Sequence, residues 1–171
     1  MYSMRKLIVI FFISLSLITF SSGDLIDDVC RKSRDFKVCT TSLRADPKSS
    51  SADEKGLIRI LLQQCLAKAT SIYNEIVNLL KETKEPVLKE CLQICKDNYD
   101  GSNEDLIDSI KYFDASDYFS LKISAAGATN GAVTCEEAFT EPPVRKSPIK
   151  SENDNFADFV HLTMSLIPPP K

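Results

Sequence analysis

The chain has 171 residues, of which 43% are hydrophobic and 26% are charged, with six cysteines and a single histidine. Its formal net charge is −3 at pH 7 and no cluster of Lys and Arg is present, which argues against a nucleic-acid partner. The sequence contains no nucleophile motif or phosphate-binding loop, and no metal-ligand pattern with a second pair of ligands. We therefore expect a protein that is not an enzyme and that needs no cofactor or metal.

The first 23 residues are typical of a secretory signal peptide. Arg5 and Lys6 precede an apolar run at 7–20, and a small residue, Gly23, stands before the expected cleavage site. Fourteen helical residues rise about 21 Å, which is too short for a hydrocarbon core of about 30 Å. We expect cleavage to release residues 24–171 as one secreted domain with no remaining membrane attachment.

The mature chain begins with a segment that predicts a short helical hairpin at 24–44. Four later stretches then repeat apolar or small residues at alternating steps of four and three, a pattern typical of helices that face a bundle core. The first is Ile58, Leu62, Cys65, Ala69, Ile72, Ile76 and Leu79; the second is Leu88, Leu92, Cys95, Tyr99, Ser102, Leu106, Ser109 or Ile110, and Phe113. The third is Leu121, Ala125, Ala128, Ala132, Cys135 and Phe139, and the fourth is Phe156, Val160, Thr163 and Ile167. The prediction is an all-α, up-and-down four-helix bundle with an N-terminal helical hairpin.

Local signals mark the ends of these helices. Ser51 and Glu54 have the spacing of a capping box for the first long helix, and Pro86 disfavours helical geometry in the residue before it. A glycine inside a helix costs about 1 kcal/mol relative to alanine, so Gly101 predicts a weak point where the second helix kinks or breaks. Pro168 ends the fourth stripe.

An exported chain enters an oxidising compartment, so the cysteines predict disulfides. Cys30 and Cys39 flank a polar segment and suit a bridge across the N-terminal hairpin. Residues equidistant from the turn of an antiparallel helix pair lie at the same height. The midpoints of Cys95–Cys135 and Cys91–Cys135 are 115 and 113, and both are near the polar break at 114–117. Spacing alone therefore leaves Cys91 and Cys95 as alternative partners of Cys135.

Cys65 and Cys91 do not suit a bridge with each other. Their midpoint is residue 78, whereas the turn between the first two long helices is expected at 83–85. The offset corresponds to a height mismatch of roughly 18 Å at helical rise, and a disulfide needs Cα atoms within about 7 Å.

The chain resembles the plant invertase and pectin methylesterase inhibitors, and within them the pollen-type invertase inhibitors. The matching segments are 30–39 with Ser42-Leu43, Ala45-Asp46-Pro47-Lys48-Ser49, Ser51-Ala52-Asp53 with Gly56-Leu57, Leu88-Lys89-Glu90, Cys95-Lys96-Asp97-Asn98-Tyr99, Ser124-Ala125-Ala126, and Thr134-Cys135-Glu136-Glu137-Ala138-Phe139. They span nearly the whole mature chain. The resemblance implies the same four-helix bundle with an N-terminal hairpin.

The resemblance also implies pairings and partners. The family pattern pairs the cysteines that correspond to Cys95 and Cys135, which leaves Cys65 and Cys91 as free thiols. Its members bind pectin methylesterase or acid invertase, here expected one to one, and block the active-site cleft with the bundle surface. Some members carry Pro-Lys-Phe near the start of the third bundle helix. The comparable stretch here, 121–123, keeps Lys122, which makes this lysine a candidate target contact.

We therefore expect a secreted inhibitor located in the cell wall, the apoplast, with the vacuole as the second choice. The alternative is a helical carrier or a signalling protein that uses the same scaffold without inhibiting an enzyme. In the carrier, the small residues of the third stripe would line a cavity between helices; in the inhibitor they allow close helix packing.

Overall fold

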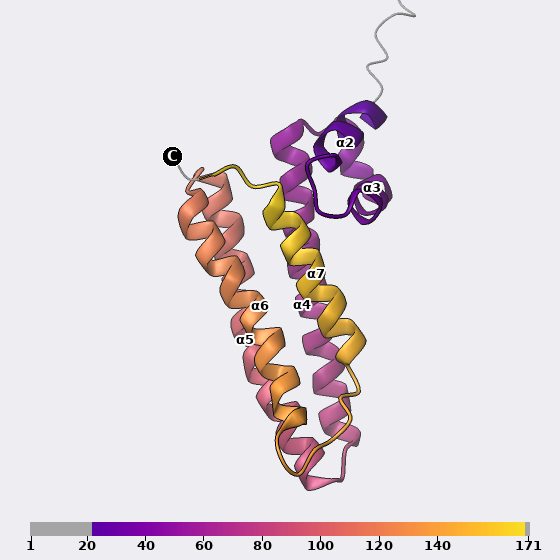
Figure 1. Cartoon of the computed structure of the whole chain (residues 1–171), viewed down its shortest axis with the longest axis vertical. Helices are drawn as coiled ribbons and strands as arrows, with labels where there is room; N and C mark the ends of the chain where they lie inside the picture. The colour runs from indigo at the N-terminus through magenta and orange to yellow at the C-terminus, as the bar shows by residue number, and fades with distance from the viewer. Residues whose placement is uncertain (1–21, 170–171) are drawn as a thin grey trace, which may run out of the picture.

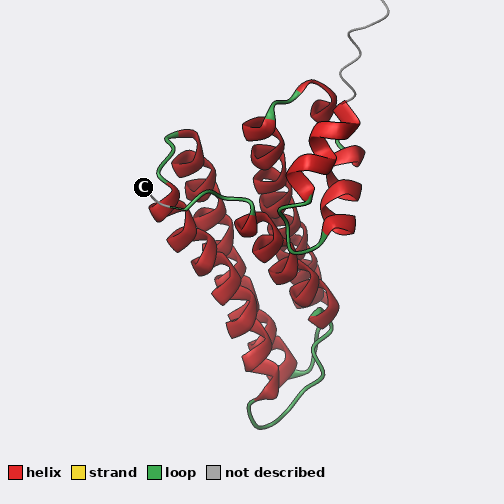
Figure 2. Ribbon diagram, turned by 45° about the horizontal axis from the view of Figure 1, so that its top comes forward, coloured by secondary structure: helices red, strands yellow, loops and turns green. Residues whose placement is uncertain are grey.

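The structure is a computed structural model that describes residues 22–169. The predicted signal peptide, residues 1–23, lies almost wholly outside these residues and stays a prediction. The regular structure of the described residues is entirely helical (Figure 2). Its elements are α2 (Ser22–Cys30), α3 (Phe36–Ala45), the 3-10 helix η1 (Pro47–Ser51), α4 (Glu54–Glu82), α5 (Pro86–Asp114), α6 (Tyr118–Thr140) and α7 (Lys150–Ser165). Across 22–169, no helix is both long and apolar enough to cross a bilayer.

Helices α4 to α7 run alternately up and down, and the α2–α3 hairpin packs beside one end of α4 (Figure 1). This confirms the predicted up-and-down bundle with its N-terminal hairpin. Helices α4 and α5 have 29 residues each, which corresponds to a length of about 43 Å. Helix α7 has only 16 residues, so the loop at 141–149 covers the remaining length.

The four predicted stripes form the core. Their members are buried except for Leu79, Leu88 and Ile110, which are half-buried. At the centre, the rings of Tyr99 and Phe156 pack with centroids 5.6 Å apart and join α5 to α7. The period of 3.6 residues was therefore sufficient to identify the inward face of each long helix.

The capping-box prediction at the start of α4 was wrong. Asp53 is the N-cap, and its side chain accepts a hydrogen bond of 2.7 Å from the backbone nitrogen of Gly56. Ser51 is instead the last residue of η1. Asp46 caps the start of that short helix by accepting a hydrogen bond from the backbone nitrogen of Lys48. The cap of α4 consequently lies two residues later than predicted.

Two further expectations about helix continuity are settled by the structure. Helix α5 continues through Gly101 without a break, because its inward residues on both sides of the glycine are packed in the core. Helix α7 ends at Ser165, two residues before the last stripe residue, Ile167. Pro168 disfavours helical geometry in Ile167, which is nevertheless buried after the helix has ended.

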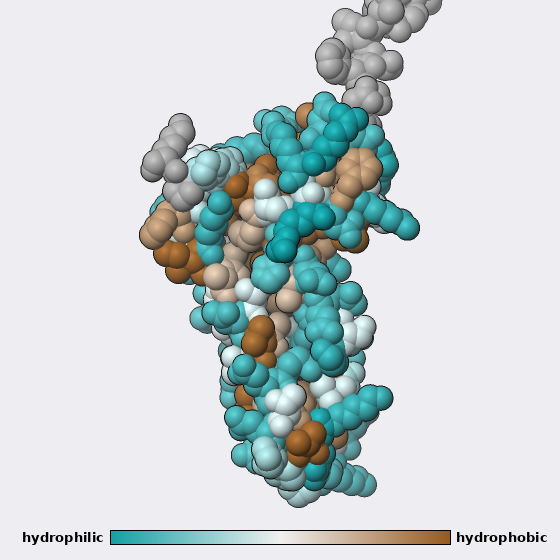
Figure 3. All heavy atoms as spheres, in the orientation of Figure 1, coloured by the Kyte–Doolittle hydropathy of each residue, from teal (hydrophilic) through white to brown (hydrophobic). Residues whose placement is uncertain are grey.

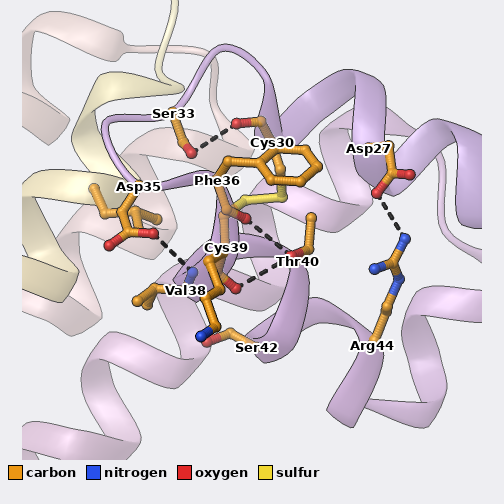
Figure 4. The surroundings of a disulfide bond; sticks show 12 residues. Asp27, Cys30, Ser33, Asp35, Phe36, Val38, Cys39, Thr40, Ser42 and Arg44 are labelled. Carbon is orange, nitrogen blue, oxygen red and sulfur yellow. Dashed lines mark hydrogen bonds and ion pairs between the residues drawn. A yellow bond between two sulfur atoms is a disulfide. The ribbon is translucent and has the colours of Figure 1, made fainter.

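The N-terminal hairpin is closed by the disulfide between Cys30 and Cys39 (Figure 4). A hydrogen-bonded ion pair of 2.7 Å between Arg44 and Asp27 also joins its two helices. The Asp35 side chain caps α3 by accepting a hydrogen bond from the backbone nitrogen of Val38 at 2.9 Å. The hairpin is therefore a closed unit in which the turn and both helices are fixed.

Candidate interaction surface

Helix α6 is held unusually close to α5. The disulfide between Cys95 and Cys135, hereafter the central disulfide, joins Cα atoms only 4.4 Å apart. At Gly131, an added Cβ would lie 2.9 Å from the backbone oxygen of Asn98 on α5, so glycine is required for this approach. The hydroxyl of Ser102 donates a hydrogen bond of 3.0 Å across the seam to the backbone oxygen of Ala128. These three contacts fix the position of α6 relative to α5.

The turn that starts α6 is also fixed. Asp117 is the N-cap, and its carboxylate accepts a hydrogen bond of 3.1 Å from the backbone nitrogen of Ser120. Hydrogen bonding first to the side chain and then to the backbone of Ser120 holds the pKa of Asp117 below its ordinary value. The guanidinium of Arg59 on α4 donates two hydrogen bonds, of 2.8 and 3.0 Å, to the carboxylate of Asp114 at the end of α5. This pair lowers the pKa of Asp114. Both interactions limit movement at the start of α6.

The outward face of α6 is uncharged along most of its length. The exposed residues at helical spacing are Phe119, Ile123, Ala126, Asn130 and Val133, hereafter the α6 stripe. Phe119, Ile123 and Val133 are 62%, 59% and 52% exposed, whereas a solvent-facing helix stripe is normally polar or charged. The stripe extends about 21 Å. Figure 3 shows apolar side chains at the surface where α5 ends and α6 begins.

Only the inward stripe of this helix was predicted from the sequence, and the outward one was missed. A signal was present, because residues 123–135 contain no charged side chain. Apolar side chains exposed along one helix face are typical of protein-interaction surfaces, which makes the α6 stripe a candidate for one.

Lys122 lies half-buried beside the first two residues of the α6 stripe. Its ammonium makes no ion pair or hydrogen bond with any residue in the described range. A cation beside an apolar stripe can approach an acidic group of a partner, so Lys122 remains a candidate contact.

The two remaining cysteines are reduced and buried. The thiol of Cys65 donates to the hydroxyl of Thr163 at 3.4 Å, and burial raises its pKa to about 12. The thiol of Cys91 donates to the backbone oxygen of Ala138 at 3.1 Å, and desolvation raises its pKa as well. Both thiols stay protonated near neutral pH and are poor nucleophiles. His161 is exposed on α7, and among residues 22–169 no group of three or more metal-ligating side chains occurs.

A disulfide-stapled helix bundle with a stiff, uncharged helix face is the architecture of a small protein that binds another protein. Comparison with known proteins makes the class specific. The chain matches the family described as plant invertase/pectin methylesterase inhibitor over residues 24–166. A pectinesterase inhibitor from Actinidia deliciosa is 32% identical over 156 residues, which is 88% of this chain and 83% of that protein.

A protein of Platanus orientalis whose name refers to invertase inhibition is 29% identical over 159 residues, 90% of this chain and 94% of its own length. The crystal structure of a mutant pectin methylesterase inhibitor from Arabidopsis superposes with a TM-score of 0.68 at 18% identity, covering 84% of this chain and 96% of that one. This chain belongs to the plant invertase/pectin methylesterase inhibitor family. Its family consists of enzyme inhibitors, which confirms the prediction that the chain is not itself an enzyme.

Proposed function

We propose that this protein inhibits pectin methylesterase or acid invertase by laying the α6 stripe across the entrance of the enzyme's active-site cleft. The observation that carries the proposal is the exposed, charge-free row from Phe119 to Val133. The centres of protein interfaces are depleted in charged residues and enriched in aromatic ones, as this stripe is.

Rigidity supports inhibition by occlusion. A surface that becomes ordered only on binding loses conformational freedom and therefore affinity. Here the central disulfide, the glycine contact at Gly131 and the capped turn at Asp117 hold α6 before any partner arrives. A one-to-one complex follows, because each chain presents a single α6 stripe.

Lys122 bears on the choice of target. Glycoside hydrolases use a pair of carboxylates to cleave their substrates. An unpaired ammonium beside an apolar stripe complements such a site, so we expect Lys122 to contribute more against invertase than against pectin methylesterase. The predicted signal peptide at 1–23 and the two disulfides suit the cell wall, with the vacuole as the second compartment.

The carrier alternative is not favoured. Ala125, Ala128 and Ala132, which would line its cavity, are 0 to 2% exposed. The adjacent glycine contact places α5 directly against this part of α6. The small residues therefore serve close helix packing.

The test is a titration of oxidised mature protein, residues 24–171, against both enzymes at acidic and at neutral pH. Ile123→Glu should weaken inhibition by about tenfold or more, since it places a charge in the centre of the interface. The matched control is Val144→Glu, because Val144 is 64% exposed, close to the 59% of Ile123. It belongs to the loop between α6 and α7, and this loop lies at the end of the bundle opposite to the start of α6 (Figure 1). Wild-type protein in large excess that slows neither enzyme would eliminate the proposal.

A further inference from the structure

A groove of about 300 Å³ runs between α6 and α7, at the far end of the α6 stripe from Lys122. Its apolar part is formed by Ala132, Val133 and Ala157. Ligand pockets for small molecules typically span about 300–1,000 Å³, so this groove is at the small end and suits a single side chain. Val133 belongs both to the groove and to the α6 stripe, which makes the two surfaces continuous.

One wall of the groove carries the carboxylate of Glu136, which is held in place by hydrogen bonds from two neighbouring side chains. The amide nitrogen of Asn153 and the hydroxyl of Ser147 both donate hydrogen bonds to Oε1 of Glu136, the latter at 2.7 Å. Asn153 is only 2% exposed, and its own oxygen accepts a hydrogen bond from the buried hydroxyl of Tyr99. Oε2 of Glu136 has no hydrogen-bond partner within the part of the chain that the structure describes. The groove therefore contains a fixed acceptor with one oxygen available.

The groove is also negatively charged overall. Three carboxylates line it, those of Glu136, Glu137 and Asp154, and one ammonium, that of Lys150. The ammonium of Lys150 donates hydrogen bonds of 3.0 Å to both carboxylate oxygens of Asp154, and the two residues form an ion pair. Glu137 is exposed and makes no ion pair with any described residue. The four charged side chains of the lining therefore sum to a net charge of −2, with the Lys150 ammonium also within electrostatic range of Glu136.

We propose that this groove receives an arginine side chain of the inhibited enzyme. This inference rests on the proposed function and names the chemistry of the partner at one end of the interface. The aliphatic part of the arginine would cover Val133 and Ala157, and its guanidinium would bond Oε2 of Glu136 and face Glu137. Arginine fits better than lysine, because its planar group presents several donors to a fixed carboxylate at once.

The groove and Lys122 can act in one interface. Val133 follows Lys122 by eleven residues on the same helix, a separation of about 16 Å at helical rise. An interface of ordinary size buries about 800 Å² on each partner and easily spans that distance. Lys122 and the groove would then contact an acidic and a basic group of the enzyme at opposite ends of the stripe.

The first experiment compares Glu136→Gln with wild type in the inhibition titration. Glutamine keeps an oxygen that accepts from Asn153 and Ser147 but replaces the free oxygen with a donor, so the fold is retained and the guanidinium is repelled. We expect inhibition to weaken by about tenfold or more, as for other interfacial charge pairs that lose one partner. The matched control is Glu75→Gln, at an exposed position on α4 that makes no ion pair with any residue of 22–169, and it should leave inhibition unchanged. Equal inhibition by wild type and Glu136→Gln would overturn the inference while the proposed function stands.

A second experiment needs no enzyme. Amide resonances of isotope-labelled protein are followed by NMR while blocked arginine amide is added, with blocked norleucine amide as the uncharged control. Saturable shifts at Val133 and Ala157 that are absent in Glu136→Gln support the groove even if neither enzyme is inhibited, in which case only the proposed function fails. If calcium chloride causes saturable shifts of these resonances and blocked arginine does not, the groove is a cation site of another kind and the inference is wrong.

Discussion

The same substitution, glycine to alanine, should have opposite effects at two positions of the α5–α6 pair. Gly131 lies on the inner side of α6, where an added Cβ would be 2.9 Å from the backbone oxygen of Asn98 and would overlap the hydroxyl of Ser102. Gly101 lies on the outer side of α5, where an added Cβ would have no neighbour within 4 Å. Neither glycine has a positive φ, so backbone strain does not enter the comparison.

The magnitudes follow from these contacts. Gly101→Ala should raise the free energy of unfolding by about 1 kcal/mol, because alanine favours the helix and loses less conformational entropy on folding. Gly131→Ala has the same helix-propensity gain, but it overlaps a backbone oxygen and disturbs the hydrogen bond from Ser102 to the backbone oxygen of Ala128. We expect a net loss of about 1–3 kcal/mol, since overpacking and a disturbed buried hydrogen bond together exceed the propensity gain.

The assay is urea unfolding of the oxidised mature protein, followed by far-ultraviolet circular dichroism and repeated by thermal unfolding. For a chain of this size, 1 kcal/mol shifts the melting temperature by about 2–4 °C, so both effects are measurable. The inhibition titration provides a second readout, because separating α6 from α5 at Gly131 should also weaken binding. A Gly131→Ala protein as stable as wild type would refute the close-packing argument, and so would two shifts of equal sign.

Three further perturbations test the framework. Replacing both cysteines of the central disulfide with alanine should lower the free energy of unfolding by about 2–4 kcal/mol, and an unchanged urea midpoint would contradict this. Tyr99→Phe should cost about 1–3 kcal/mol, because it leaves the buried oxygen of Asn153 without its donor; the check is thermal unfolding. The pKa of Asp114 is lowered by Arg59, so this pair stabilises the fold above the ordinary value of 3.8 and the stabilisation is lost as pH falls through the depressed pKa. Asp114→Asn should therefore lower stability by about 0.2–1 kcal/mol near pH 6, and the difference should shrink as the pH falls below 3.8; a difference that stays constant on going from pH 6 to below 3.8 would show that charge is not the cause.

Most of the fold could be predicted from local patterns. Inward stripes such as Leu92 to Leu106 repeat at helical spacing, and a bundle core requires little more than that each helix bury one face. The helix boundaries were less predictable. The cap at Asp53 depended on η1, whose formation before α4 changes which residue precedes the first helical turn. Short polar segments offer several capping residues, and only the neighbouring structure selects among them.

Residues along the chain determined the helix count of the bundle and the inward face of each helix, because these depend on hydrophobicity and its period. Cysteine spacing left Cys91 and Cys95 as equal partners of Cys135, and before the structure only the family resemblance favoured Cys95. Tertiary structure shows that pairing, because Cys91 and Cys95 share a helix face and the axial alignment of α5 with α6 separates them by one turn. It also decided that Tyr99, Asn153 and Glu136, from three different helices, form one hydrogen-bonded chain beside a groove. Such constellations depend on where helices cross, and helix crossing is set by packing between segments that are distant in sequence.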